Sequence, residues 1–369
     1  MWPYPVSIIS YLVVAAIVVW LSIKLSTLVD LLDKKTNLSG ALLGGILLAA
    51  TTSLPELFTS FTATVLVKNN SLVMGNILGS NIFNMVLFTI IYLFFFKKVV
   101  SSKVDKSHTF TMVIIGLLYV TVTVASYVFN FHNILWGWFN PLSILIVVLY
   151  AINIWKTPKE EDDKDNAEED DSPKGKRKPL TGIAKYFAFK DEADLTVKQV
   201  IVLFILYALA LIGASIGITY LTDWVVSVYG FGSTFGGALF LGVATSLPEL
   251  TATINLSKRG NVNAAYGNII GSCSFNFCIL TLADLMSFAC STRTYAADQS
   301  TFLLLVLGGF SFLILFASII VKRKMNLKGS TGERIYFYIT GILLVASYLT
   351  FLVLSNINLG LEFAPYVVG

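Results

Sequence analysis

The sequence predicts an all-α integral membrane protein with ten transmembrane helices, arranged as two inverted five-helix repeats with proline-broken helices at the midplane. Three observations support this prediction. The chain is 56% hydrophobic and 13% charged, with a mean hydropathy of +0.76, whereas soluble domains carry about 25% charged residues. The apolar residues form blocks of ~20, which is the length of a helix that crosses the hydrocarbon core. Two polar motifs inside these blocks each occur twice.

The apolar blocks define ten predicted spans. Those of the first half are residues 6–28, 38–66, 72–96, 108–130 and 134–155, and those of the second half are residues 197–221, 234–256, 262–288, 300–321 and 335–356. The short alternating segments of a membrane β-barrel are not evident. The first apolar block lacks the basic flank of a signal peptide, and it is longer than the apolar segment that a signal peptide contains. We therefore expect it to be retained as the first span.

The chain divides into two halves joined by a polar linker. Residues 1–155 form the first five-helix half, with a repeat at about 38–96, and residues 199–369 form the second, with a repeat at about 234–288. The linker, residues 156–198, is acidic at 160–171 and then basic. Blocks of like charge repel and stay solvated, so a disordered linker is favoured over a cation-sensing segment.

The basic residues predict the orientation. With the N-terminus outside, 23 Lys and Arg residues fall in cytoplasmic loops, against Lys68 and Arg293 outside. The positive-inside rule therefore puts both termini outside and the linker in the cytoplasm, with the cell membrane as the expected location. Because each half has five spans, the second half enters the membrane inverted relative to the first, as in many secondary transporters.

Several function classes lack their sequence signals. The net charge is only +4 and the basic residues lie in loops, so there is no nucleic-acid footprint. The three cysteines have neither a disulfide pattern nor zinc-ligand spacing. No HExxH or GxSxG motif is present, and both histidines lie at the ends of a span away from the motifs. We therefore expect neither an enzyme nor a bound cofactor.

The first repeated motif is Thr-Ser-Leu-Pro-Glu, which ends at Glu56 and again at Glu249. An ionised carboxylate within lipid costs at least ~2.5–3.5 kcal/mol on insertion scales. Neither predicted span contains a Lys or Arg that would pair with its glutamate. A cation is therefore the expected partner; the alternative is a protonated glutamate hydrogen-bonded between helices.

The prolines of this motif place further oxygen atoms near each glutamate. Pro55 and Pro248 lack the N–H group that a helix interior needs, so each is expected to open a turn and free backbone carbonyls. Such backbone is tolerated at membrane depth only where it lines a cavity or is buried in protein. Ser53 and Ser246 add hydroxyl groups three residues before each glutamate. Oxygen ligands of this kind suit a hard cation such as Ca²⁺ or Na⁺.

The second repeated motif is Gly-Asn-Ile-x-Gly-Ser, which begins at Gly75 and again at Gly267. A spacing of four residues places three polar side chains on one helix face in each half: Asn76, Ser80 and Asn84, then Asn268, Ser272 and Asn276. The glycines permit close packing, and the amides and hydroxyls can also join helices. We expect both roles, with the polar face turned toward the ions.

Together these motifs resemble the α-repeats of the cation/calcium exchanger superfamily, in its sodium/calcium exchanger branch. The resemblance implies export of Ca²⁺ in exchange for Na⁺ by alternating access, through a lipid-embedded protein expected to work as a monomer. It implies central carboxylates at Glu56 and Glu249. It also implies that the ion sites are completed by Thr52, Ser53, Thr245, Ser246, Ser80, Asn84, Ser272 and Asn276, and by backbone carbonyls near Ala49 and Gly242.

Two positions depart from this family pattern. Several prokaryotic relatives have Asp at the position of Asn276, and often Asn at that of Cys273. Two carboxylates still balance one divalent ion, but the sodium stoichiometry stays open. Coupling to H⁺, a different divalent cation and, more distantly, a passive cation channel remain as alternatives. Neither the oligomeric state nor the role of the acidic linker follows from the sequence.

Overall fold

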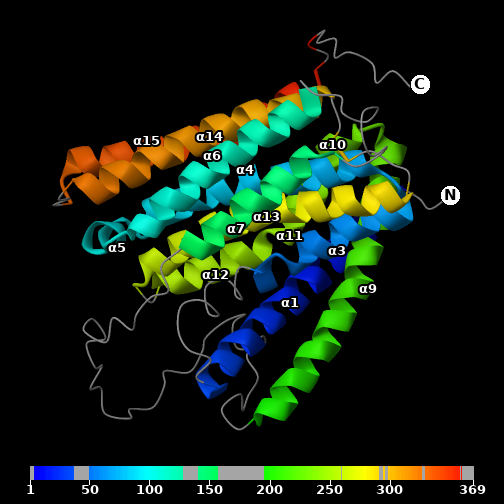
Figure 1. Ribbon diagram of the computed structural model, residues 1–369, viewed down its shortest axis with the longest axis horizontal. Coiled ribbons are helices and arrows are strands. Elements are labelled where there is room, and N and C mark those ends of the chain that lie inside the picture. The colour runs from blue at the N-terminus through cyan, green and yellow to red at the C-terminus, as the bar shows by residue number, and fades with distance from the viewer. Residues whose placement is uncertain are drawn as a thin grey trace.

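The computed structural model describes residues 4–36, 50–127, 140–156, 195–258, 260–290, 294–295, 298–325, 329–357 and 359, and within them every regular element is a helix (Figure 1). The first half contains α1 (Tyr4–Thr36), α3 (Leu54–Thr62), the π-helical η1 (Ala63–Val67), α4 (Asn70–Phe94), α5 (Phe96–Ser101), α6 (Lys106–Tyr127) and α7 (Leu142–Lys156). The second contains α9 (Val197–Tyr229), α10 (Ser233–Gly236), the π-helical η4 (Gly237–Leu241), α11 (Gly242–Thr245), α12 (Leu247–Lys258), α13 (Val262–Cys290), α14 (Gln299–Lys324) and α15 (Thr331–Leu354).

Seven of the described helices are long and apolar enough to cross a membrane. The bent pair Ser233–Thr245 and Leu247–Lys258 raises this number to eight if it is one span. The helices Leu54–Val67 and Leu142–Lys156 are shorter. The predicted spans 38–66 and 134–155 start in residues that lie outside the described part of the chain, so the count of ten stays a prediction.

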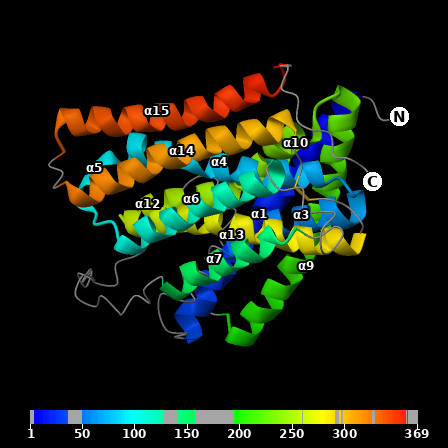
Figure 2. The same ribbon diagram turned by 45° about the horizontal axis from the view of Figure 1, so that its top comes forward.

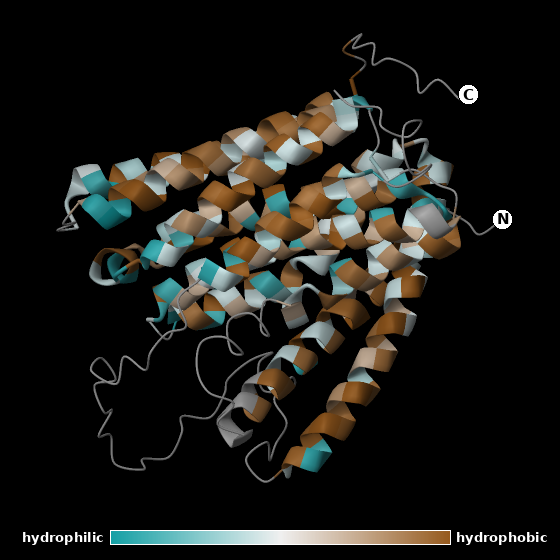
Figure 3. Cartoon of the chain, viewed as in Figure 1, coloured by the Kyte–Doolittle hydropathy of each residue, from teal (hydrophilic) through white to brown (hydrophobic). Residues whose placement is uncertain are grey.

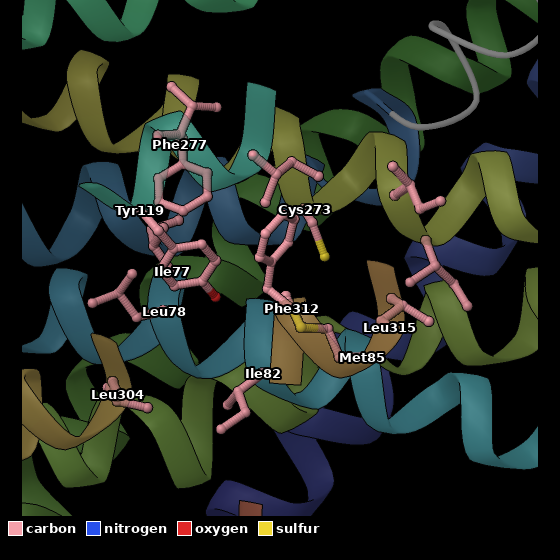
Figure 4. Close-up of a cluster of buried hydrophobic side chains, with 14 of the residues drawn as sticks. Ile77, Leu78, Ile82, Met85, Tyr119, Cys273, Phe277, Leu304, Phe312 and Leu315 are labelled. Carbon is pink, nitrogen blue, oxygen red and sulfur yellow. The ribbon is translucent and has the colours of Figure 1, made fainter. Parts of the chain in front are cut away.

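Helix α4 lies at the centre of the molecule. It packs on α13, α14 and α15, and also on α10, η4 and α11 from the second half. Figure 4 shows part of the resulting core, in which α4 side chains meet Tyr119, Phe277 and Phe312 from three other helices. The view in Figure 2 shows α14 and α15 side by side along one edge.

The helices α1 and α9 form a separate pair that is inclined to the other helices (Figure 1). A smaller apolar cluster joins them, with Val18 and Leu25 packed near Leu211 and Ile218. The outward faces of the long helices are predominantly apolar (Figure 3). Leu209 is 60% exposed and Ile342 is 61% exposed, as expected for side chains that face lipid rather than water.

Glycines allow α4 to approach the second half backbone to backbone. A Cβ atom added at Gly75 would lie 2.1 Å from the carbonyl oxygen of Thr234, and one at Gly79 would lie 2.4 Å from the Cα of Ala238. On the facing segment, a Cβ at Gly237 would lie 2.4 Å from the carbonyl oxygen of Leu72. These contacts fix α4 against the segment that leads into the second Thr-Ser-Leu-Pro-Glu motif.

Both copies of this motif interrupt a helix at the serine. Helix α11 ends at Thr245, Ser246 forms a turn, and α12 starts at Leu247 with its axis turned by 40°. In the first half Ser53 occupies the turn before α3. Each proline then occupies the first turn of the following helix, where its missing N–H has no partner to lose.

Candidate cation-binding site

The two glutamates of the repeated motifs are held by hydrogen bonds that cross between the halves. The Ser53 hydroxyl donates to Oε1 of Glu249 (3.2 Å), and the Ser246 hydroxyl donates to Oε1 of Glu56 (3.3 Å). All four side chains are fully buried. The arrangement is the pseudo-symmetric one that two inverted copies of one motif would produce, and it brings the two glutamates into one site.

The local structure explains why the serines are available for this role. Ser53 is the N-cap residue of α3, yet its side chain makes no capping hydrogen bond, although serine at this position usually caps its own helix. Its hydroxyl is instead directed to the glutamate of the other half. Glu56 and Glu249 lie in the first turns of α3 and α12, where the positive end of the helix dipole favours a negative charge.

Hydroxyl groups from the second motif extend this site. The Ser272 hydroxyl donates to Oε1 of Glu249 (3.3 Å) and lies 3.5 Å from the Thr52 hydroxyl. In the mirrored position the Ser80 hydroxyl lies 3.5 Å from the Thr245 hydroxyl. Each half therefore places one serine of α4 or α13 beside a threonine of the other half.

A backbone carbonyl also faces this region. The Ser80 hydroxyl donates to the carbonyl oxygen of Gly242 (3.2 Å), one of the two positions where a carbonyl ligand was expected. The other position, Ala49, lies outside the described residues. Close approach at Gly242 requires a glycine, because an added Cβ would lie 2.9 Å from the backbone nitrogen of Ser80.

One oxygen of each glutamate is left without a partner. Oε2 of Glu56 and Oε2 of Glu249 are buried and make no hydrogen bond, and no basic side chain pairs with either group within the described residues. A buried charge without a partner is costly, so these two oxygens mark where a cation would be held. The surrounding atoms are hydroxyl and carbonyl oxygens, which are the ligands of hard cations.

The amides of the second motif divide into two groups. Both polar side-chain atoms of Asn84 are buried without a hydrogen bond. Oδ1 of Asn276 is also buried without a hydrogen bond, while its Nδ2 donates to Oδ1 of Asn81 (2.9 Å). Asn76 instead donates to the hydroxyls of Thr59 and Ser60, both at 3.0 Å.

The hydroxyl partners of Asn76 and Asn268 are not among the residues predicted for the site. Asn268 donates to the Thr253 hydroxyl (3.4 Å). Thr59 and Ser60 follow Glu56 by three and four residues, and Thr253 follows Glu249 by four. Residues three or four apart share a helix face, so the spacing of these hydroxyl residues from the glutamates could have predicted that they lie near the site.

Comparison with known proteins agrees with this architecture. A family model described as sodium/calcium exchanger protein matches residues 6–156 and 199–356. Among solved structures, the H⁺/Ca²⁺ exchanger CAX has a TM-score of 0.65 at 14% identity, covering 95% of this chain and 86% of that chain. The native YfkE structure has a TM-score of 0.61 at 14% identity, covering 95% of this chain and 96% of that one.

The sodium-calcium exchanger NCX_Mj has a TM-score of 0.53 at 18% identity, covering 94% of this chain and 99% of that chain. A comparison with curated proteins gives no match. At these identities the solved structures establish a common fold. They include exchangers of both coupling types, so they do not separate Na⁺ from H⁺.

Proposed function

Because the chain belongs to the sodium/calcium exchanger protein family, within the cation/calcium exchanger superfamily, we propose that it is a secondary antiporter that exports Ca²⁺ in exchange for Na⁺. The family consists of membrane transporters of cations, including Ca²⁺. Membership of the family gives the transport of cations, and Na⁺ as the coupling ion is what we propose in addition.

The observation that carries the proposal is the pair of buried glutamates with one unpartnered oxygen each. Two negative charges balance either one Ca²⁺ or two monovalent cations. Because both kinds of ion need the same two carboxylates, the binding of one lowers the affinity of the site for the other. Competition of this kind, combined with two inverted halves that open to alternate sides, produces exchange rather than passive flow.

The donor atoms around the glutamates can accommodate Na⁺ as the coupling ion. The hydroxyls of Thr52, Thr245, Ser80 and Ser272 and the Gly242 carbonyl provide neutral oxygen ligands next to each carboxylate. Na⁺ and Ca²⁺ both require several oxygen ligands to replace their water, and these groups can supply them to either ion. We propose that these groups, with Ser53, Ser246, Asn84, Asn276 and the Ala49 carbonyl, hold the transported ions.

Proton coupling is the second candidate. Both glutamates are fully buried and have no basic partner within the described residues, so a proton on each Oε2 would also neutralise them. The H⁺/Ca²⁺ exchanger CAX shares the fold. The two candidates differ only in which monovalent cation displaces Ca²⁺ from the carboxylates.

The proposed arrangement in the cell follows from the sequence. We propose ten spans in two inverted halves (residues 1–155 and 199–369), both termini outside, and the charged linker 156–198 in the cytoplasm of a cell-membrane protein that works as a monomer. The positive-inside distribution of Lys and Arg supports this orientation.

Calcium uptake into proteoliposomes tests the coupling ion. Vesicles loaded with Na⁺ are compared with vesicles loaded with K⁺ at the same internal and external pH, and then with K⁺-loaded vesicles under an imposed pH gradient. Uptake that requires the outward Na⁺ gradient would support the proposal. Uptake driven by the pH gradient alone would replace Na⁺ with H⁺, and uptake that needs no counter-ion would contradict antiport.

A further inference from the structure

A third carboxylate is buried in the membrane-spanning part of the protein, away from both repeated motifs. Asp284 lies on α13, the helix that also carries Ser272 and Asn276, and is the only acidic residue of that helix. It follows Asn276 by eight residues, which corresponds to about 12 Å along the helix axis. Its side chain is fully buried.

One oxygen of Asp284 is bound by the start of α7. Oδ2 accepts hydrogen bonds from the backbone N–H of Asn140 (2.9 Å) and from the Ser143 hydroxyl (2.7 Å). The Ser143 hydroxyl also lies 2.6 Å from the Tyr295 hydroxyl. These donors, together with the positive end of the α7 dipole, stabilise a negatively charged Asp284.

The other oxygen of Asp284 has no partner. Oδ1 is buried and makes no hydrogen bond. The Thr294 hydroxyl interacts with the same carboxylate and lies 2.7 Å from the Ser287 hydroxyl. A carboxyl group that kept its two bonds at Oδ2 could carry a proton at Oδ1.

No basic group pairs with Asp284 in the described part of the chain. Helices α4 and α7 pack on α13, and the first turn of each contains no charged side chain. Lys68 at the end of η1 is exposed to solvent, and Tyr127 at the end of α6 bonds to the backbone of Asp298. Among the described residues, the other titratable groups near this end of α13 include Tyr295, Asp298, Cys290 and Asp223, whose carboxylate accepts from Asn69.

We propose that Asp284 reversibly binds a proton and forms a proton site separate from the two glutamates. Burial of a charge with no cationic partner favours uptake of a proton, while the two donors and the α7 dipole favour its release. One O–H bond forms at Oδ1 with a proton from water, and the proton returns to water when that bond breaks.

Occupancy of this site changes how α13 is held. Hydrogen bonds to a charged carboxylate are stronger than those to a neutral acid, so protonation of Asp284 weakens the hydrogen bonds between α13 and the start of α7. A second hydrogen bond farther along α7 and α13, from Nδ2 of Asn153 to the Ser274 hydroxyl (3.3 Å), is unaffected. The proton therefore acts selectively at one end of the helix that carries Ser272.

Infrared spectroscopy of the full-length protein in lipid tests the proposal directly. The C=O stretch of a protonated carboxyl group is recorded across a pH titration in the Glu56→Gln/Glu249→Gln variant, which removes the signals of both glutamates. We expect a band that disappears as the pH rises and that is lost when Asp284→Asn is added. Asn keeps the acceptor for Asn140 and Ser143, so this variant is expected to fold.

Two further variants sharpen the test. Ser143→Ala removes one donor to the charged form, so the band should persist to a pH higher by about one unit. Asp223→Asn, the same change at a partly buried aspartate of α9 that accepts from Asn69 (2.8 Å), should leave the band unchanged. A band absent at every pH, constant at every pH, or retained in Asp284→Asn would overturn the proposal. The readout does not depend on which ions are transported.

Discussion

Ser53 and Glu249 are separated by 196 residues in the chain, and the serine hydroxyl donates to the glutamate carboxylate at 3.2 Å. The mirrored contact joins Ser246 to Glu56 at 3.3 Å. Each glutamate is thus oriented by a serine from the other half, and Glu249 also accepts from Ser272 of its own half.

Removing the charge of either glutamate should abolish divalent cation transport. Glu56→Gln and Glu249→Gln keep the size of the side chain and one oxygen acceptor, but they halve the charge available to balance Ca²⁺. We expect loss of at least ~100-fold in uptake rate, consistent with ~3 kcal/mol for an uncompensated buried charge. Calcium uptake into proteoliposomes is the measurement.

The matched control for these variants is Glu333→Gln. Glu333 belongs to the capping box at the start of α15, where Gln fills the same role, so uptake should be unchanged. Full activity of either Glu56→Gln or Glu249→Gln would exclude the glutamates as the central ligands.

Both crossed serines should contribute to Ca²⁺ binding. Ser53→Ala and Ser246→Ala each remove one hydrogen bond to a carboxylate, which is worth about 1.5–3 kcal/mol. The apparent affinity for Ca²⁺ should fall by about 10- to 100-fold in both variants, as measured from the concentration dependence of uptake. Ser347→Ala is the control, because the Ser347 hydroxyl bonds only to a carbonyl of its own helix. A large effect from one serine and none from the other would argue against the crossed arrangement.

A third carboxylate should change the charge moved in each cycle. With two carboxylates, one Ca²⁺ is balanced by two monovalent ions, and exchange should not respond to membrane potential. Asn276→Asp adds a negative charge that a third monovalent ion would balance. The change is sterically conservative. It removes the hydrogen bond from Nδ2 of Asn276 to Oδ1 of Asn81, but the Asn81 amide can turn so that its unpartnered Nδ2 donates to the new carboxylate.

Uptake under potentials set with K⁺ and valinomycin measures this effect. The natural protein should give the same rate at all potentials, and Asn276→Asp should give a rate that depends on potential. Equal voltage dependence in the two proteins would show that residue 276 does not set the ion ratio.

Alanine at the close helix contact should destabilise the fold. Gly79→Ala would place a Cβ 2.4 Å from the Cα of Ala238, and overpacking of this kind costs about 1–3 kcal/mol. Thermal unfolding in detergent should therefore begin at a lower temperature. Gly309→Ala on α14 is the control, since no atom lies within 4 Å of an added Cβ and Ala is the better helix former. Equal stability of the two variants would contradict the close contact.

The sequence predicted the helical membrane fold and the exchanger family, and both are confirmed. These features depend on local signals: apolar runs of span length, and acids within them that need a partner. The crossed contacts were not predicted, because the spacing of three residues placed each serine near the glutamate of its own half, whereas the structure joins it to the glutamate of the other half. The ion-ligand roles of these residues remain predictions.

Other features depend on packing that no local pattern encodes. The π-helical segments Ala63–Val67 and Gly237–Leu241 shift the register of helices whose sequences read as ordinary apolar runs. Asp284 was visible as an acid in an apolar span, yet its partners Asn140 and Ser143 lie about 140 residues earlier in the chain. The start of α7 meets α13 only in the folded protein.

The exchange of serines between the halves has an evolutionary consequence. In a single ancestral copy the motif serine would have had no glutamate of a second copy to bind, so the crossed contacts would have required two chains of opposite orientation, assembled as an antiparallel dimer. After gene fusion, Ser53 would have been constrained by Glu249, and Ser246 by Glu56. Among homologous chains, substitutions at each of these two serines should therefore be correlated with substitutions at the glutamate of the other half.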